Sequence, residues 1–362
     1  MLVSLSGCQS AQEKAYQGQR DTAPPLYEHF QETLDFYANN LSYNGVDDLF
    51  SVADGTGQMN IYSQEAVAPI ASIKWIEPEV GMSSAAFLDS DTYYLGGDRL
   101  YGNGKYFFEV WRLGASSKRV GYDFESSTGG EVQVNAHFAL FGREMINWHS
   151  GERYIARTVN VHPGNSLLSA SGKVLSYNYF SDDVGLHEPL TDTLLEWDGG
   201  MSISQVAITA DERYVIAHGR NGSCRIWPLP ALKPVQRCGA GKLFADKLAY
   251  IATHPADGSF AVAWDRRVAF YRPDAEDRQH KVFGLSLSKP IVSLAVSADN
   301  RLAIGDNSGT LEVWDGVQRK LLGQAKLGPD AAGTKLQFSP SGRQLLYGRN
   351  PKFNVHVLDI PQ

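Results

Sequence analysis

The residues of this sequence best suited to chemistry are its three cysteines, Cys8, Cys224 and Cys238. Cys224 and Cys238 lie 14 positions apart, and the proline-rich segment between them is typical of a turn that joins two strands. If those strands are antiparallel neighbours, the two side chains face each other within reach of a disulfide bond. The spacing therefore predicts a Cys224–Cys238 disulfide in an oxidising compartment. Two unrelated, half-buried thiols are the alternative.

The segment Leu5-Ser6-Gly7-Cys8 resembles the lipobox of bacterial lipoproteins. The resemblance implies that a signal is cut before Cys8 and that the Cys8 thiol carries lipid such as palmitate. Gln9, which follows the cysteine, implies sorting to the outer membrane. Only seven residues precede Cys8, and they include no basic region and no full apolar region. A start codon upstream of Met1 would supply the rest of the signal, and an accidental match is the alternative.

The segment that follows Cys8 is polar and carries no strand periodicity. Residues 9–32 contain Pro24-Pro25 and are predicted to form a flexible tether. The expected organisation is therefore a signal remnant at 1–8, a tether at 9–32 and one folded domain at 33–362.

Motifs for common catalytic sites are missing from the sequence. It has no Gly-x-Ser-x-Gly, His-Glu-x-x-His, phosphate-binding Gly-x-x-x-x-Gly-Lys-Ser/Thr or Cys-x-x-Cys-His segment. The nine histidines are scattered, and His162 and His254 are predicted to lie in turns rather than to bind metal. His149 and His218 are expected near strand ends, in solvent. The sequence thus predicts no catalytic residue, no metal and no cofactor.

A repeat of about 43 residues organises the C-terminal half. Equivalent large apolar residues, Trp227, Tyr271, Trp314 and Leu358, lie 44, 43 and 44 positions apart. Each is preceded by the same order of strand, turn, strand and tight turn. Four short strands in 40 to 45 residues are typical of one blade of a β-propeller, which buries its faces only by stacking in a ring.

Two segments make the resemblance to a known family specific. Trp314-Asp315 and Phe338-Ser339-Pro340-Ser341-Gly342 resemble the repeats of WD-repeat β-propellers. The resemblance implies an all-β fold of four-stranded antiparallel blades. The Gly-His dipeptide of that family is missing throughout, so its buried His–Asp hydrogen bonds are not expected here.

The N-terminal half carries the same pattern at less regular spacing. Counting blades gives eight, or seven if residues 131–157 are an elaboration rather than a blade. The last blade ends in its third strand, within 355–360, so its fourth strand must come from elsewhere. Residues 33–38 are predicted to supply it, which would close the ring with an N-terminal strand.

Composition agrees with one large all-β domain. The chain has 362 residues, a net charge of −7, 20% charged residues and 35 glycines. This composition excludes general disorder and coiled coils, and the charge gives no case for nucleic-acid binding. No apolar run is long enough for a transmembrane helix.

Charge is expected to differ between the two faces of the disc. The predicted turns between second and third strands carry nine basic residues against five acidic ones, whereas the turns between first and second strands are acidic. This candidate partner-binding face comprises Arg99, Lys105, Arg143, Lys173, Arg220, Arg266, Arg267, Arg349 and Lys352. Such a face could bind an acidic protein or glycan. Ordinary solvated loops are the alternative.

Together these features predict a non-catalytic, lipid-anchored propeller that serves as a protein-interaction scaffold. Its architecture is similar to that of the outer-membrane assembly propeller lipoproteins. The expected partners are other envelope proteins and, through the lipid, the membrane, with no nucleic acid and no small-molecule cofactor. One alternative is a propeller enzyme, a hydrolase or isomerase acting on a small sugar or lactone in the central funnel. The other is a soluble cytosolic WD-repeat adaptor.

Overall fold

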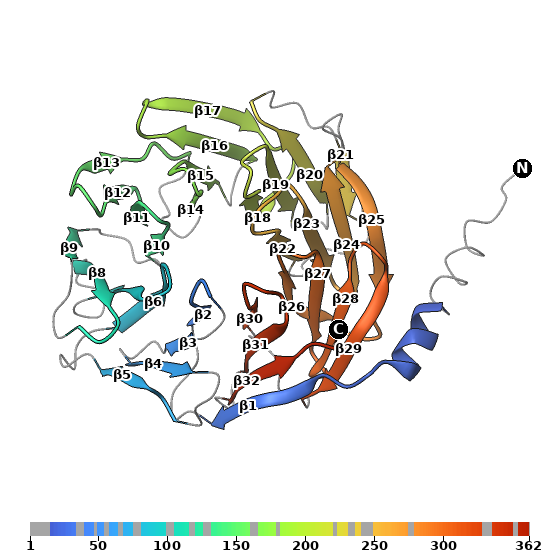
Figure 1. Cartoon of the computed structure of the whole chain (residues 1–362). Coiled ribbons are helices and arrows are strands. Elements are labelled where there is room, and N and C mark those ends of the chain that lie inside the picture. The colour runs from blue at the N-terminus through green and yellow to red at the C-terminus, as the bar shows by residue number, and fades with distance from the viewer. Residues whose placement is uncertain are drawn as a thin grey trace, which may run out of the picture.

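The structure is a computed structural model, and it confirms the predicted eight-bladed β-propeller. It describes residues 15–33, 40–46, 49–53, 58–63, 68–74, 81–98, 105–115, 120–125, 132–159, 166–178, 182–219, 223–230, 236–239, 249–273, 279–327, 335–349 and 354–361. Eight four-stranded antiparallel sheets stand in a ring (Figure 1). Residues 131–157, whose status decides between seven and eight blades, hold a complete blade, β10 to β13.

The blades are numbered here in chain order. Blade 1 consists of β2 (Asn40–Tyr43), β3 (Leu49–Ala53), β4 (Gln58–Ser63) and β5 (Ala71–Lys74), and blade 2 of β6 (Gly81–Phe87), β7 (Thr92–Asp98), β8 (Lys105–Arg112) and β9 (Val120–Glu125). Blade 3 consists of β10 (Gln133–Val134), β11 (Phe138–Phe141), β12 (Glu144–Asn147) and β13 (Arg153–Ile155), and blade 4 of β14 (Ser166–Leu168), β15 (Val174–Tyr177), β16 (Asp183–Glu188) and β17 (Thr193–Asp198).

The remaining blades follow the same plan. Blade 5 consists of β18 (Ile203–Ile208), β19 (Tyr214–Gly219), β20 (Ser223–Pro228) and β21 (Gln236–Gly239), and blade 6 of β22 (Ala249–Thr253), β23 (Phe260–Trp264), β24 (Arg267–Pro273) and β25 (Gln279–Ser286). Blade 7 consists of β26 (Ile291–Val296), β27 (Arg301–Asp306), β28 (Thr310–Asp315) and β29 (Lys320–Lys326), and blade 8 of β30 (Lys335–Phe338), β31 (Gln344–Arg349), β32 (Asn354–Asp359) and β1 (Tyr27–Thr33). The first strands surround the centre, and most neighbouring ones contact one another.

The hydrophobic core is divided among the gaps between blades. Eight clusters of buried side chains are present, and each draws on two neighbouring blades. The cluster between blades 8 and 1, for example, packs Leu346 and Val357 against Phe50 and Tyr62. Every blade therefore covers both of its apolar faces with its neighbours, as the repeat requires.

The ring is closed by an N-terminal strand, as predicted, but by different residues. β1 pairs with β32 along Tyr27–Thr33, not along 33–38; residues 34–39 lie outside the described part of the chain. β1 contains the polar residues Glu28, Gln31 and Glu32, so a search for apolar strands does not find it. An outermost strand is paired on only one side, so it tolerates polar residues that a central strand does not.

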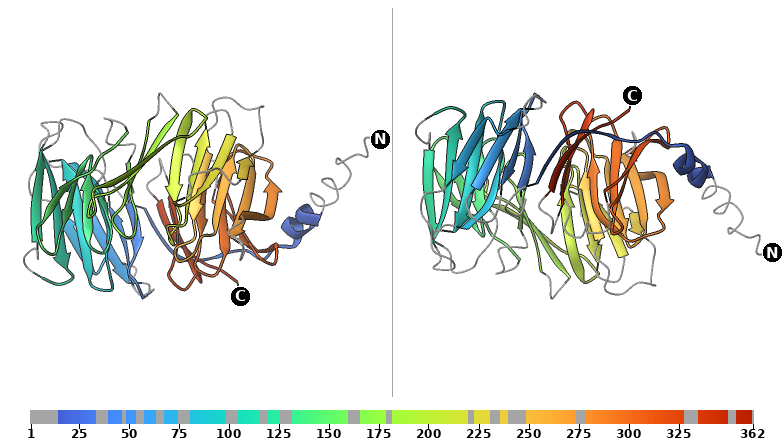
Figure 2. Two further views of the ribbon diagram at one scale, coloured as in Figure 1. Left: turned by 90° about the horizontal axis from the view of Figure 1, so that it is seen from above. Right: turned by 90° about the horizontal axis from the view of Figure 1, so that it is seen from below.

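Residues 15–32 do not form the tether that the sequence predicts; residues 9–14 are outside the described part. Residues 15–22 form a helix at the rim of the disc (Figures 1 and 2). Its Tyr16 is buried in the core between blades 6 and 7 and meets the Trp314 ring edge to face at 5.4 Å. A helix of two turns gives little periodicity, so the helical pattern of the sequence does not reveal this docking.

The segment after the helix lies along the outer edge of blade 7. The Leu26 amide donates to the Gln324 carbonyl at 2.8 Å, and the Gln324 amide donates to the Pro24 carbonyl at 3.0 Å. A Cβ on Gly323 would come within 2.6 Å of the Leu26 side chain, so a glycine is needed here for the close approach. We call residues 15–33 the N-terminal strap.

An ion pair fixes the strap to blade 7. Arg20 Nε lies 2.7 Å from Glu312 Oε1, and the two side chains are only 16% and 5% exposed. Glu312 also accepts a hydrogen bond from the indole of Trp314 at 2.8 Å. The carboxylate is therefore desolvated and depends on Arg20 for its counter-charge.

Replacing Arg20 is predicted to destabilise the fold. Arg20→Met leaves the Glu312 charge buried without a cation, and we expect the free energy of unfolding in urea to fall by about 3 kcal/mol. Adding Glu312→Gln should recover most of the loss, because the amide oxygen still accepts from Trp314.

Arg112→Met is the matched control. It breaks an ion pair with Asp91 whose partners are 71% and 42% exposed. A loss of about 0.5 kcal/mol or less is expected there. Equal losses in Arg20→Met and Arg112→Met would contradict the role given to the buried pair.

Candidate protein-interaction face

Antiparallel blades give the disc two different faces. Turns between second and third strands lie on one face together with the links between blades, and we call this the connection face. Turns between first and second strands lie on the other, which we call the cavity face. The described turns follow this alternation in every blade. Interaction residues can therefore be assigned to a face by their position in the repeat.

Some of the nine predicted basic residues lie on the connection face. Arg143, Arg266 and Arg267 are exposed there, at the turns of blades 3 and 6. Lys105 begins β8 and Arg349 ends β31 at the same face. The other predicted residues of this face, Arg99, Arg220 and Lys352, lie outside the described residues.

Lys173 was assigned to the wrong face. It precedes β15, in the turn between the first and second strands of blade 4, and so lies on the cavity face. β14 has only three residues, Ser166–Leu168, and such a short strand gives no alternation to recognise. Gly172, with φ +95°, belongs to the same first turn.

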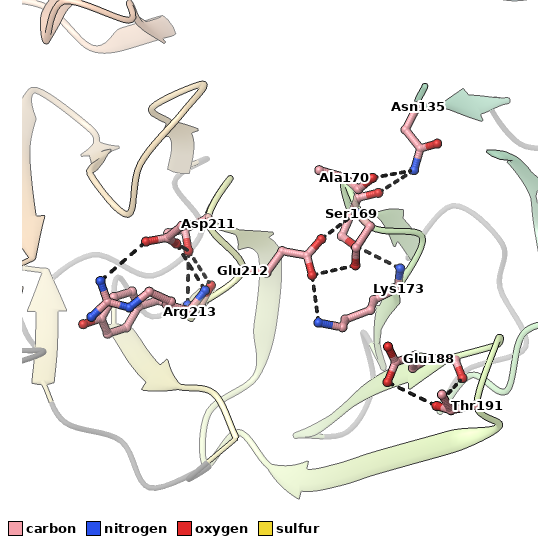
Figure 3. A network of polar contacts seen from close by, with 12 residues as sticks. Asn135, Ser169, Ala170, Lys173, Glu188, Thr191, Asp211, Glu212 and Arg213 are labelled. Carbon is pink, nitrogen blue, oxygen red and sulfur yellow. Dashed lines mark hydrogen bonds and ion pairs between the residues drawn. The ribbon is translucent and has the colours of Figure 1, made fainter. Parts of the chain in front are cut away.

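Lys173 connects two blades instead of facing a partner. Its Nζ lies 2.8 Å from Glu212 Oε2 in blade 5 (Figure 3). The Ser171 hydroxyl and amide each donate to the same carboxylate at 2.7 Å. Because these donors satisfy the carboxylate, the first turns of blades 4 and 5 are held together.

Similar contacts recur around the cavity face. In each, a side chain in or directly after one first turn donates to a backbone carbonyl of the next blade's first turn. The pairs are Asn44 to Ser90, Asn135 to Ser169, His254 to Ala298, and Arg301 to Gly342. They join neighbouring turns in a chain that lacks the family's Gly-His dipeptide.

The pKa of Glu212 reflects this network. Burial by itself would raise it, but the hydrogen bonds from Lys173 and Ser171 outweigh burial and hold the pKa at about 2. The charged form of Glu212 is therefore the one that the folded state favours.

Two histidines have structural positions. His254 lies in a turn, as predicted: Nδ1 accepts from the Ala256 and Asp257 amides, and Nε2 donates to the Ala298 carbonyl. His162 is outside the described residues. His218 is fully buried in β19 rather than solvated, and burial lowers its pKa to about 4. The prediction that His218 lies in solvent is therefore wrong.

A cavity of about 700 Å³ opens at the centre of the cavity face. It is lined by first strands and first turns of blades 1, 2, 6, 7 and 8, with mainly apolar side chains such as Ile251, Leu294 and Leu336. Asp89 is the one carboxylate among the described residues of this lining, and its Oδ1 accepts the amides of Asp91 and Thr92. Those described residues thus include no pair of free acid and base groups.

The described part of the chain also gives no sign of a metal centre. No group of three His, Cys, Asp or Glu side chains is arranged there to hold a metal ion. Nor does any helix in those residues have the length and apolar content needed to cross a bilayer.

A second hollow, of about 410 Å³, lies beside the strap helix between blades 6 and 7, and we call it the rim pocket. Its lining residues are Gln17, Arg20, Trp264, Asp265, Arg266, Arg267, Ser286, Leu287 and Ser288. It therefore combines two residues of the predicted basic face with Arg20, which the sequence did not single out.

Cys224 forms a disulfide and is buried in β20. Cys238 is the residue directly opposite it in the ladder between β20 and β21. The pairing of these two cysteines stays a prediction, and Cys8 lies outside the described residues.

Comparison with known proteins identifies the fold. No protein-family model and no curated protein matches the chain. It is similar to the C-terminal WD40 domain of Sif2, with a TM-score of 0.70 and 12% identity over 94% of this chain and 99% of that domain. It is also similar to the β-propeller domain of Myceliophteria thermophila Cps50 (Swd1), with a TM-score of 0.55 and 10% identity over 92% and 99%. The chain has a WD40-like β-propeller fold.

A third similar structure is Chaetomium thermophilum Raptor, with a TM-score of 0.60 and 10% identity. The match covers 99% of this chain and 31% of Raptor. At such low identities the WD40-like propeller itself is what the likeness establishes. Any role of its faces must be argued from the residues described above.

One signal could have located the strap contact in this WD40-like propeller. Glu-Val-Trp occurs twice, at 109–111 and at 312–314, on the third strands of blades 2 and 7. In both copies the glutamate is buried and accepts from the tryptophan indole. A repeated buried acid predicts a cation from another segment, and Arg20 is that cation in blade 7.

The Glu212 network is predicted to make stability depend on acid. The ordinary pKa of a glutamate is near 4.5 and that of Glu212 is about 2, so its contribution is complete above the first value and lost as pH falls toward the second. Glu212→Gln should cost roughly 2 kcal/mol at neutral pH and almost nothing at the acid end.

The effect is measured by urea unfolding of the native chain and of Glu212→Gln, from neutral pH down to the pKa of Glu212. Glu188→Gln is the control, because the Glu188 carboxylate accepts a hydrogen bond from Thr191, which lies in the same turn of blade 4. A Glu212→Gln cost that stays constant with pH would contradict the linkage.

Proposed function

We propose that this chain is a non-catalytic scaffold, lipid-anchored through Cys8 at the periplasmic side of a bacterial outer membrane. The observation that carries this proposal is that Arg143, Arg266 and Arg267 are exposed on the connection face of a chain whose net charge is −7. Exposed arginines on one face suit binding of acidic partners. The WD40-like fold, known from the propeller domain of Swd1 and from Raptor, agrees with binding other proteins, here other envelope proteins.

The strap bears on the proposed anchor. Since the helix is packed from residue 15 onward, only residues 9–14 separate Cys8 from the folded disc. An extended chain of that length spans about 25 Å at most. A lipid on Cys8 would thus keep the rim of blades 6 and 7 close to the membrane, and partners would be met in the plane of the bilayer.

The disulfide of Cys224 supports an oxidising location. Disulfides persist in the periplasm and are rare in the cytosol. This favours an envelope scaffold over a cytosolic WD-repeat adaptor.

The anchor is tested by metabolic labelling with palmitate in bacteria that express the gene from its own locus. We expect labelling of the native protein and complete loss in Cys8→Ser, because the thiol that would carry the lipid is gone. Ser6→Ala keeps a small residue before the cut and should label normally. Unchanged labelling of Cys8→Ser would overturn the anchor.

The pairing of the other cysteines is tested by digestion without reductant after alkylation. We expect one cross-linked peptide containing Cys224 and Cys238, because the two residues are opposite each other in one ladder. Alkylation of both thiols in the native protein would show the prediction to be wrong.

A further inference from the structure

The rim pocket is built on a rigid turn. Asp265 and Arg266 form the tight turn between β23 and β24, and Asp265 has φ +51°. The Asp265 carbonyl accepts the Ile291 amide at 2.6 Å, and the Arg266 carbonyl accepts the Leu287 amide at 2.7 Å. Both turn carbonyls are thus tied to the link between blades 6 and 7. Side chains on a fixed backbone lose less entropy when they bind a ligand.

The pocket carries a surplus of positive charge. Among its described lining residues are Arg20, Arg266 and Arg267 and one carboxylate, that of Asp265; the charge of Arg20 is already paired with Glu312, so Arg266 and Arg267 supply the surplus. Arg266 is 56% exposed, and its Nε is 3.8 Å from Asp265 Oδ2, which is long for an ion pair. Arg267 is exposed and has no ion pair within the described part of the chain. Two guanidinium groups therefore remain available to an anion.

The other described side chains of the lining are neutral. Trp264 lines the pocket and is 8% exposed, but its indole nitrogen is itself buried and is therefore not a donor to a ligand. Ser286 and Ser288 also belong to the lining, and Leu287 and Trp264 are its large apolar residues. Such a lining suits oxygen acceptors carried on short aliphatic stems.

From this chemistry we propose that the rim pocket binds an acidic segment of a partner protein through its Asp or Glu carboxylates. The proposal rests on the scaffold function proposed above and names its partner surface. Arginine pairs carboxylates in bidentate geometry, and the apolar wall accommodates the methylenes of a glutamate. A concave pocket favours a peptide over a lipid headgroup layer, because a flat membrane surface cannot enter it.

The test uses the purified full chain and a fluorescein-labelled octaglutamate peptide, with fluorescence anisotropy at about 50 mM NaCl to limit screening. We expect saturable binding that weakens by about tenfold in Arg266→Ala/Arg267→Ala. Ser288→Glu, an exposed change that places a carboxylate in the pocket, should weaken it similarly. All variants should keep the native circular dichroism.

The matched control is Arg213→Ala/Arg343→Ala, which removes two exposed arginines from the cavity face. Its affinity should equal that of the native chain. Equal loss in both double variants, or no binding of octaglutamate by the native chain, would overturn the proposal. Arginine-dependent binding to phosphatidylglycerol vesicles without peptide binding would assign the pocket to the membrane and overturn it too.

This assay is independent of the anchor. The purified chain needs no lipid on Cys8 to bind the peptide. Loss of the palmitate result would remove the proposed anchoring while leaving the anisotropy result standing, so the two failures are distinguishable.

Discussion

Closure of the ring is the constraint on which the whole structure depends. A four-stranded blade has two apolar faces and can cover neither alone, so each of the eight hydrophobic clusters joins two blades. An open ring would expose two such faces to water. The N-terminal strap meets this constraint by supplying the outermost strand of blade 8 and by bracing blade 7. Turn-to-turn hydrogen bonds on the cavity face hold several neighbouring blades in the same way.

The strap recognises the repeat at equivalent positions. Arg20 pairs with Glu312 on the third strand of blade 7, and Glu28 pairs with His356 on the third strand of blade 8. Glu312 and His356 are 44 residues apart, which is one repeat. A polar residue within each third strand thus becomes a contact for a segment that lies some 300 positions away in sequence.

The blades were predictable because their signal is periodic. Strand alternation and turn residues recur every 43 or so positions, and an error in one copy is corrected by the others. The strap, by contrast, occurs once. Its helix is too short for periodicity, and its strand is polar because only one side is paired. The predicted face of Lys173 is wrong for a related reason, since β14 is too short to fix the register of blade 4. The sequence could not predict the rim pocket, because Arg20 and Arg266 come to line the same pocket only in the folded ring.

The strap also sets an order of events in time. Its residues are synthesised before all eight first strands, yet β29 and β32, along which they lie, belong to the last two blades in chain order. Until residue 359 has been synthesised, β1 has no partner and blade 8 lacks its outer strand. Blades 1 to 7 can stack in chain order, but β1 must wait for β32. Completion of this ring therefore depends on a late event that pairs β1 with β32, two strands more than 300 residues apart in sequence.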